Sequence, residues 1–364
     1  MGINNLRLMN DFVKNLQDEE SKKIFDARFD YFIYKDKEKF YEKIDDVLLS
    51  KKRVYSCRRL GQYYERHPEN REKKVTVFGA GEGGKITCRS LVSYVGKKID
   101  CICDNNEELN GLEYRGIPIR NFSYICENSK DNIIIVATSA KYQLEIYYQL
   151  VMAGVGEDNI LMIPDGAIWC NIPHQYFDVD ALQPEESGEY FIDAGCFNGE
   201  TSVQCLDWCG GRLKMVYAFE PDKDNYLICN KRFQNIAGLK YELYECATWD
   251  KETVLNFDHV ENAGYASSVS VNGNISVKAD SIDNRLRGRK ATFIKMDVEG
   301  SELETLKGAE KTILKYRPKL AISLYHKDED IVTIPIFLER LGLGYKYYLR
   351  HYQTRMCETV LYAI

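Results

Sequence analysis

The 364-residue chain has no apolar run approaching the ~20 residues that a helix needs to cross a bilayer, and its first residues, MGINNLRLMNDF, lack the apolar core of a signal peptide. An excess of basic residues is also missing, since 49 Lys and Arg stand against 55 Asp and Glu and give a formal charge of −6. Such a balance supplies no positive field to attract a polyanion. These absences predict a cytoplasmic protein with no membrane span and no nucleic-acid partner.

Cysteine pairs with metal-binding spacing are absent as well. The 12 cysteines are scattered through hydrophobic segments. Cys101 and Cys103 are separated by one residue and Cys205 and Cys209 by three, whereas structural zinc sites typically pair cysteines two residues apart. We therefore expect reduced thiols that behave as small buried hydrophobic groups, and no structural metal.

Apolar residues, in contrast, are plentiful. Hydrophobic residues make up 45% of the chain and aromatic residues 12%, which is enough to offset the entropy lost on folding. Because single cores stop growing below ~250–300 residues, a chain of this length predicts two domains and an appendage.

The order of patterns along the chain predicts four segments. Residues 1–70 have helical spacing, with no glycine between Ile3 and Leu60, and should form a helical N-terminal segment. Residues 71–165 alternate strands and helices, which predicts a small Rossmann-like α/β domain. Residues 166–189 should form a linker that packs on the next domain, and residues 190–364 a second α/β domain.

The second domain shows five apolar strands, near residues 190, 217, 243, 295 and 322, separated mostly by polar helical stretches. The last 20 residues fit two antiparallel strands with a turn near 353–355. A parallel sheet closed by an antiparallel hairpin is the arrangement of class I methyltransferases, although several doubly wound folds would tolerate it.

The first turn of this domain has the features of a cofactor site. A strand ends at Asp193, Gly195 and Gly199 permit close approach of a ligand, and a helix begins directly afterwards. Glu220 follows the next strand, where an acid accepts the hydroxyls of a ribose. An acid at the first position repels diphosphate and suits the amino group of S-adenosylmethionine, although Asp193 capping the turn is the alternative.

Several segments together resemble the FkbM family of S-adenosylmethionine-dependent methyltransferases: DAGCFNGETS, YAFEPDKDNY, FIKMDVEGSELETLKGAEKTI, RPKLAISLYHKDEDIVTIPIFL and YYLRHY…ETVLYA. The resemblance spans about 170–364, and QYFD at 175–178 and the residues at 266–268 also resemble family segments that flank the site. The sequence departs from the family at Cys196 and Phe197, where small or aromatic residues followed by an acid are more frequent.

The resemblance implies a seven-stranded class I sheet and methyl transfer to a hydroxyl oxygen, often of a sugar or natural product. Together with the turn pattern, it assigns cofactor binding to Gln175, Tyr176, Asp193, Gly195, Gly199, Glu220, Pro221, Ala247 and Asp297.

Methyl transfer needs an acceptor oxygen held in line with the methyl group, and a general base helps because sugar hydroxyls have a high pKa. The candidates for catalysis at the sheet edge are Asp297, Glu299, His326 and, more weakly, His351. Structural roles are the alternative for His326, and a helix-capping turn for Glu299. Asp297, Glu299 and His326 would also suit a divalent cation, which we do not favour.

The smaller domain contains a second glycine-rich turn. Gly79, Gly81 and Gly84 satisfy G-x-G-x-x-G between a strand and a helix, and Asp104 ends the next strand. A nucleotide or nucleotide-sugar site, a nicotinamide site and a scaffold with no ligand all fit this pattern. We favour the nucleotide-sugar, because no hydride-transfer residues are evident elsewhere.

The sequence as a whole predicts an O-methyltransferase acting on a sugar, nucleotide-sugar or glycan hydroxyl, and it is compatible with a homo-oligomer. A cofactor-binding scaffold without turnover and an NAD-dependent oxidoreductase are the alternatives.

Overall fold

The structure, a computed structural model, describes residues 2–50, 55–56, 58–163, 169–170, 175–257 and 275–364. The chain divides into two compact units, which we describe one at a time. Unit 1 comprises Met1–Ile44, Pro173–Tyr352 and Met356–Ile364, and unit 2 comprises Asp45–Ile172 and Gln353–Arg355. The run at 266–268 lies outside the described residues.

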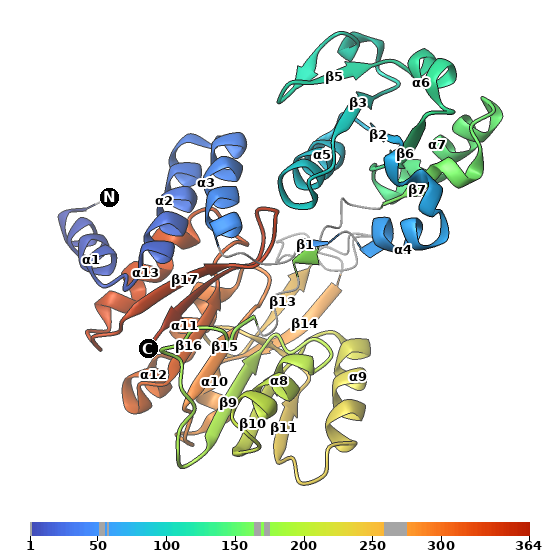
Figure 1. Cartoon of the computed structure of the whole chain (residues 1–364). Helices are drawn as coiled ribbons and strands as arrows, with labels where there is room; N and C mark the ends of the chain where they lie inside the picture. The colour runs from blue at the N-terminus through green and yellow to red at the C-terminus, as the bar shows by residue number, and fades with distance from the viewer. Residues whose placement is uncertain (1, 51–54, 57, 164–168, 171–174, 258–274) are drawn as a thin grey trace. The chain divides into compact units, whose positions relative to one another are not determined.

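Unit 1 contains a seven-stranded sheet in the order β11-β10-β9-β15-β16-β18-β17 (Figure 1). Its strands are β9 (Glu189–Ala194), β10 (Leu213–Phe219), β11 (Tyr241–Tyr244), β15 (Phe293–Met296), β16 (Lys319–Ser323), β17 (Tyr347–His351) and β18 (Thr359–Ala363). The first five strands run parallel, while β18 pairs antiparallel with both β16 and β17. The predicted class I sheet with its terminal hairpin is confirmed.

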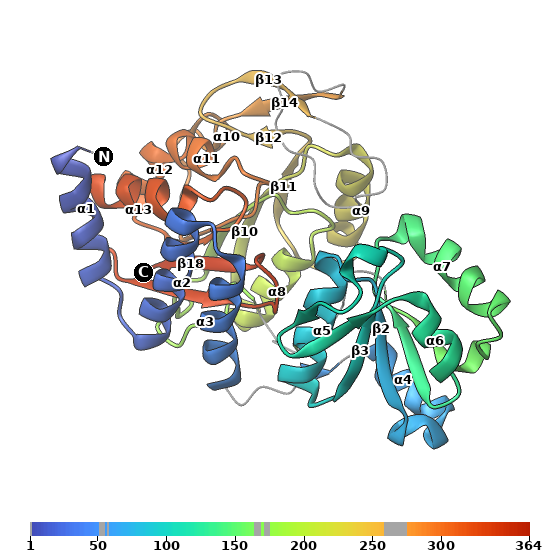
Figure 2. The ribbon, with the colours of Figure 1, turned by 90° about the horizontal axis from the view of Figure 1, so that it is seen from above.

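Helices cover both faces of this sheet, which explains why its central strands are mostly apolar. Every residue of β15 and β16 is buried. The helices form two groups (Figures 1 and 2). The helices of the first group pack against β9, β10 and β11, and those of the second group pack against one another. The first group is α8 (Glu200–Trp208) and α9 (Lys223–Gln234); the second is α10 (Ile282–Leu286), α11 (Glu302–Gly308), α12 (Glu310–Tyr316) and α13 (Asp330–Arg340).

The N-terminal residues are helical, as the sequence predicts. α1 (Ile3–Lys14), α2 (Glu19–Tyr34) and α3 (Lys37–Ser50) follow one another, and α2 packs on β17. Phe12 is fully buried with its ring centroid 4.7 Å from that of Tyr347, and Leu16 forms a parallel bridge with Tyr347. This segment therefore covers an edge strand that would otherwise expose unpaired backbone groups.

A small three-stranded sheet, ordered β12-β14-β13, was not predicted. It consists of β12 (Ala247–Thr248), β13 (Thr253–Phe257) and β14 (Ile275–Asp280). β13 and β14 pair antiparallel, and β12 joins β14 in parallel.

Unit 2 contains a six-stranded sheet in the order β4-β5-β3-β2-β6-β7. Its strands are β2 (Lys74–Phe78), β3 (Ile99–Cys103), β4 (Glu113–Tyr114), β5 (Ile117–Arg120), β6 (Asn132–Val136) and β7 (Ile160–Met162); its helices include α4 (Arg58–Arg66), α5 (Glu82–Val95), α6 (Phe122–Asn128) and α7 (Ala140–Met152). Unit 2 also contains the short antiparallel pair β1 (Tyr55–Ser56) and β8 (Trp169–Cys170).

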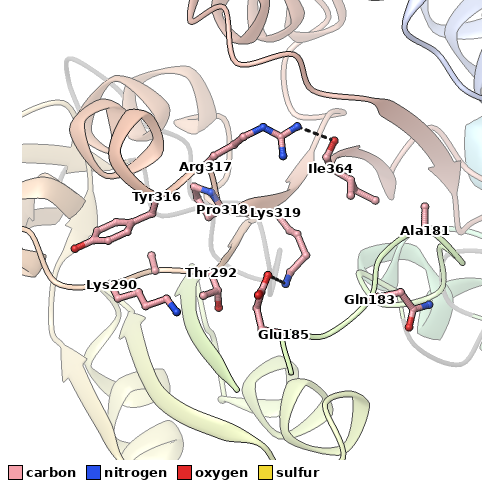
Figure 3. A pocket seen from close by; sticks show the side chains of 11 residues that line it. Ala181, Gln183, Glu185, Lys290, Thr292, Tyr316, Arg317, Pro318, Lys319 and Ile364 are labelled. Atoms are coloured by element: carbon pink, nitrogen blue, oxygen red, sulfur yellow. Dashed lines mark hydrogen bonds and ion pairs between the residues drawn. The ribbon is translucent and has the colours of Figure 1, made fainter. Parts of the chain in front are cut away.

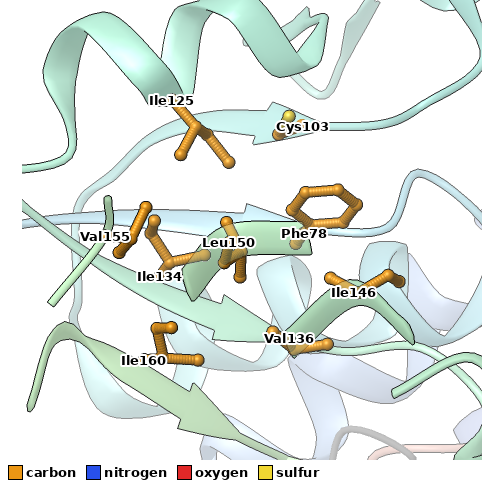
Figure 4. Packing of buried hydrophobic residues seen from close by; sticks show 9 residues of the cluster. All are labelled: Phe78, Cys103, Ile125, Ile134, Val136, Ile146, Leu150, Val155 and Ile160. Atoms are coloured by element: carbon orange, nitrogen blue, oxygen red, sulfur yellow. The ribbon is translucent and has the colours of Figure 1, made fainter. Parts of the chain in front are cut away.

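The parallel strands of unit 2 place the first strand between the second and the fourth, which is the Rossmann-type order. A cluster of buried apolar side chains from β2, β3, β6, α6 and α7 forms the core on one face (Figure 4). It includes Phe78, Ile125, Ile134, Val136 and Leu150.

Candidate functional site

The turn after β9 is held together by a buried ion pair. Asp193 is fully buried, and its Oδ1 lies 3.3 Å from Lys295 Nζ on the neighbouring strand β15. Ser202 of α8 donates to Asp193 Oδ2 at 2.7 Å, and Lys295 also donates to the Gly195 carbonyl at 2.7 Å. Burial raises the pKa of Asp193, although Lys295 and Ser202 act against it. The Asp193 carboxylate is thus engaged inside the protein, and its contact with a cofactor stays a prediction.

The two glycines of this turn are required by the packing of the protein itself. A Cβ on Gly195, whose φ is +74°, would lie 1.9 Å from the Asp297 carbonyl oxygen. A Cβ on Gly199, with φ +79°, would lie 2.8 Å from the side chains of Cys229 and Phe233 of α9. Close approach of a ligand, which we expected from the sequence, is therefore not needed to explain either glycine.

Glu220 follows β10 and accepts two backbone hydrogen bonds at the carboxyl edge of the sheet. Phe197 N donates to its Oε2 at 2.8 Å and Asp222 N to its Oε1 at 2.9 Å. Burial raises the pKa of Glu220 to about 7, although these hydrogen bonds act to lower it. The carboxylate thus lies beside the glycine turn, as a ribose-binding acid should.

The other predicted cofactor residues are spread over the surrounding elements. Pro221 follows Glu220, Ala247 begins β12, and both are partly exposed. Gln175 donates through Nε2 to Glu358, and Tyr176 N donates to the Tyr362 hydroxyl at 3.0 Å. Their roles in cofactor binding remain predictions.

Asp297 follows β15 and is the centre of a group that we call the carboxyl-edge cluster. The Tyr176 hydroxyl donates to its Oδ2 at 3.1 Å and the Tyr325 hydroxyl to its Oδ1 at 3.2 Å. His326 Nε2 lies 3.6 Å from Oδ1. Burial acts to raise the pKa of Asp297, but the charges of Lys295 and His326 outweigh it and lower the pKa. The cluster consists of Tyr176, Asp297, Glu299, Glu302, Tyr325, His326 and Glu358.

His326 lies between carboxylates. Its Nδ1 is 2.7 Å from Glu302 Oε1 and its Nε2 is 3.4 Å from Glu299 Oε2. Burial acts to lower the pKa of His326, but the hydrogen bond and charge of Glu302, aided by Asp297 and Glu299, raise it to about 9. The structure thus brings together three of the four predicted catalytic residues, namely Asp297, Glu299 and His326.

Glu299 is the most exposed carboxylate that contacts this histidine. Its side chain is 44% exposed, whereas that of Asp297 is 26% exposed and that of Glu302 is fully buried. Burial of its carboxyl group raises the pKa of Glu299 to about 7. Its backbone φ of +52° is in the left-handed region and places the side chain at a tight turn before Gly300.

Glu302 was not predicted as a site residue. The sequence indicates only the start of a helix there, since an acid at that position is common for plain helix stability. In the structure Glu302 Oε1 accepts from Val298 N at 3.1 Å, besides its contact with His326. Among the described residues, Asp297, Glu302 and His326 form a set whose potential metal-ligating atoms lie within 4.8 Å of one another.

Backbone strain concentrates around this cluster. Eight described residues other than glycine have positive φ, and four of them flank the carboxyl edge: Tyr176, Phe197, Glu299 and Glu358. Each such conformation costs of order 1 kcal/mol or more in a residue with a side chain. Residues held in this way are frequent at functional sites, where the surrounding structure enforces their geometry.

The structure does not bring His351 to the cluster as a catalytic group. The side chain is 1% exposed, Nδ1 lies 2.7 Å from Thr359 Oγ1 in the neighbouring strand, and the ring packs edge-on against Phe40 of α3. An imidazole buried in this way has no open side for an acceptor. These contacts favour a packing role for His351 over the predicted catalytic one.

In unit 2, the second glycine-rich turn is also packed tightly. A Cβ on Gly79 would lie 2.7 Å from Thr138 Cγ2, and one on Gly84 would lie 1.6 Å from the Gly79 carbonyl oxygen, whereas the space at Gly81 is open. Asp104 accepts from Ala80 N at 2.7 Å and so fixes the turn. These contacts fit the scaffold interpretation, and a ligand at this turn stays a prediction.

A pocket of about 440 Å³ lies at the opposite edge of the unit 1 sheet (Figure 3). Thr292 and Lys319, at the starts of β15 and β16, line it together with Glu185, Lys290 and Arg317. Ligands of open α/β sheets bind at the carboxyl ends of the strands, so this pocket is not the expected cofactor site.

Comparison with known families decides the class of unit 1. Residues 188–347 match the family model described as the methyltransferase FkbM domain. Residues 188–347 form an FkbM methyltransferase domain. The resemblance noted in the sequence is thereby confirmed, and the FkbM domain includes the glycine turn, Glu220 and most of the carboxyl-edge cluster. No curated protein matches the chain.

Solved structures similar to the chain include methyltransferases. The methyltransferase FkbM from Methylobacillus flagellatus KT is 17% identical, with a TM-score of 0.47, and the match covers 84% of this chain and 93% of that one. Fibrillarin from Aeropyrum pernix, solved with S-adenosyl-L-methionine, is 11% identical, with a TM-score of 0.33, over 52% of this chain and 71% of that one. These similarities are weak, so the assignment rests on the family match and the strand order. No described helix is both long and apolar enough to cross a membrane.

Proposed function

We propose that the FkbM domain transfers a methyl group from S-adenosylmethionine to a hydroxyl oxygen of a sugar or glycan-related acceptor. The observation that supports this most is the gathering of Asp297, Glu299 and His326 at the carboxyl ends of β15 and β16 in a domain of a methyltransferase family. Ligands of this sheet type bind at that edge, and carboxylates accept the hydrogen bonds that sugar hydroxyls donate.

In this reaction the acceptor oxygen attacks the methyl carbon in line with the carbon–sulfur bond. The new carbon–oxygen bond forms as the carbon–sulfur bond breaks, the sulfonium becomes a neutral thioether, and the hydroxyl proton passes to a base. Positioning of the two reactants supplies most of the acceleration. The residues of the chain therefore have to orient the hydroxyl and accept one proton.

We assign the proton to Glu299. Asp297 already accepts from two tyrosine hydroxyls, and His326 Nδ1 is hydrogen-bonded to Glu302. The side chain of Glu299, in contrast, is 44% exposed and lies in the same cluster as Asp297 and His326, so its carboxylate is accessible to an acceptor. Asp297 would then orient the acceptor or the sulfonium, and Glu220 would bind the ribose.

The experiment is methyl transfer by the full chain from labelled S-adenosylmethionine to a panel of neutral sugars, amino sugars and nucleotide-sugars, with the product located by mass spectrometry. We expect label on a hydroxyl oxygen. Glu299→Gln should lower kcat by ~10²–10⁴-fold, because the proton acceptor is lost, with little change in affinity for the thioether product.

Glu310→Gln, an exposed glutamate of α12, is the matched control and should retain full activity. Label on nitrogen, or wild-type turnover in the Glu299→Gln chain, would contradict the proposal. Cofactor binding without turnover on any acceptor would favour the scaffold alternative, and NAD reduction by a sugar would favour the oxidoreductase.

For unit 2 we propose that the turn around Gly81 contacts a nucleotide-linked sugar. The Rossmann-type strand order and the open space at Gly81 support it. Gly81→Leu should weaken binding of UDP-sugars in calorimetry if this is correct, while leaving S-adenosylmethionine binding unchanged.

A further inference from the structure

We propose that Asp297, Glu302 and His326 together bind one divalent metal cation at the carboxyl edge of the FkbM domain. Each offers a ligand atom, and these atoms lie within 4.8 Å of one another. Asp297 directly follows β15, Glu302 begins α11, and His326 lies in the segment after β16. The catalytic role that we give the ion rests on the proposed function, whereas the binding itself does not.

The donor atoms suit a cation that accepts both oxygen and nitrogen. Two carboxylates and one imidazole form a set that binds Mn²⁺, Mg²⁺ or Zn²⁺. Glu302 Oε1 and His326 Nδ1 are 2.7 Å apart, close to the separation of ~3 Å between neighbouring ligands of an octahedral ion with bonds of about 2.1 Å. Asp297 lies on the other side of the same ring, with Oδ1 at 3.6 Å from Nε2. We infer that its side chain turns toward the ion when the ion binds.

A second feature of Glu302 points independently to a cation. The residue is 0% exposed, and in the part of the chain that the structure describes its Oε2 has no hydrogen-bond partner. A buried carboxylate oxygen without a partner costs folding free energy, because it has lost its hydrogen bonds to water and has formed none in the protein. A metal ion beside Glu302 would supply the missing interaction.

The charges around Asp297, Glu302 and His326 also favour a divalent cation. Glu299 and Glu358 lie in the carboxyl-edge cluster, and Asp330 is 3% exposed at the start of α13. Two lysines oppose this charge: Lys295 is 3.3 Å from Asp193 and so offsets that acid first, and Lys327 acts on Asp330. Negative charge therefore exceeds positive charge among these residues, and a dication reduces the repulsion between them.

The ion would act on the acceptor hydroxyl. A bound cation polarises an oxygen and makes its proton easier to remove. Glu299 is outside the ligand set, so it is left to take that proton. His326 ligates through a nitrogen lone pair, and the ion therefore displaces the proton that lies between Nδ1 and Glu302, which is released to solvent.

The test measures Mn²⁺ binding to the full chain after chelator treatment, by calorimetry and by electron paramagnetic resonance, without cofactor or acceptor. We expect one Mn²⁺ per chain, with proton release. Glu302→Gln and His326→Ala should each weaken binding by at least ~10–100-fold. Glu299→Gln and Glu310→Gln should leave the affinity near that of the wild type, and Mg²⁺ and Zn²⁺ are measured in parallel.

Absence of binding for all three ions, or equal affinity in the wild type and the Glu302→Gln chain, would overturn the proposal. If Glu302→Gln does not fold, Asp297→Asn removes a different ligand and makes the same prediction. If methyl transfer persists in chelator and no metal binds, the metal site is contradicted while the proposed function is still supported. Metal binding without methyl transfer would support the metal site and contradict the proposed function.

Discussion

At the scale of single residues, the buried pair of Asp193 and Lys295 is the strongest candidate for a stability effect. Both side chains are almost fully buried, and Lys295 Nζ lies 3.3 Å from Asp193 Oδ1. Removing one partner of a buried pair leaves an uncompensated charge, which is more costly than losing the pair as a whole. The glycine turn depends on this pair, because Lys295 also donates to the Gly195 carbonyl.

We therefore predict that Asp193→Asn lowers the free energy of unfolding by about 3–5 kcal/mol, measured by urea denaturation. A second chain with both Asp193→Asn and Lys295→Met should regain part of that loss, because the unpaired ammonium group is removed, although Asp297 then loses the charge of Lys295. If the single and double variants were equally unstable, the pair would not be the source of the effect.

The sequence indicated the residue types of the site better than their roles. Asp297, Glu299 and His326 were predicted together because residues after neighbouring parallel strands meet at one edge. Glu302 was missed, since only the three-dimensional path of the turn after β15 brings it to His326. The burial of His351 could not be predicted, because a strand period does not tell which face of a hairpin is covered once helices such as α3 pack on it.

At the scale of elements, Asp18 links the start of α2 to the edge strand β17 through a hydrogen bond and an ion pair. Its carboxylate caps α2 by accepting from Ser21 N at 2.8 Å and lies 2.7 Å from Arg350 Nη2. Burial acts to raise the pKa of Asp18, but the Arg350 and Ser21 interactions outweigh it and lower the pKa below 3.8. Asp18 thus joins a helix cap and an ion pair in one side chain.

A lowered pKa in the folded state means that the ionised carboxylate stabilises the fold above the unfolded pKa of about 3.9, and that this stability is lost as the pH falls through the folded value. Asp18→Asn keeps a good capping residue but removes the charge. We expect it to cost about 1 kcal/mol or less at pH 7, because the pair is partly exposed.

The difference between Asp18→Asn and the wild type should shrink as the pH is lowered below about 3.9, followed by urea titration at each pH. Asp36→Asn, at the residue that accepts from Lys39 N beside α3, is the matched control. A difference that did not depend on pH would mean that packing, and not charge, explains the loss.

Most parallel strands of both units were predictable because they are largely buried and appear as mainly apolar runs. The small β12-β14-β13 sheet was not, since β12 has only two residues and pairs with a strand more than 25 residues away. Pairing over such a distance leaves little local signal.

At the scale of the whole molecule, the division into two units predicts separate responses to ligand. Product thioether, S-adenosylhomocysteine, should bind only unit 1, because the FkbM match and Glu220 both lie there. At 100 times its Kd the ligand stabilises its unit by ~2.7 kcal/mol, which corresponds to a rise of roughly 5–10 °C in Tm.

Calorimetric scans should therefore show two transitions, only one of which moves with the ligand. Glu220→Ala should abolish the shift, while a UDP-sugar should move the other transition. A single transition that moves as a whole would show that the two units unfold cooperatively. The presence of two cores was predictable from length, whereas the inclusion of residues 1–44 in the same unit as the C-terminal domain was not.

The left-handed conformations of Phe197 and Glu358 have a consequence for attempts to improve the protein. Glycine at either position would relieve the steric conflict, so a laboratory selection for heat resistance should find these changes early. The resulting variants would have a higher Tm but more mobile turns beside Asp297. We therefore expect their kcat at moderate temperature to be lower than that of the wild type.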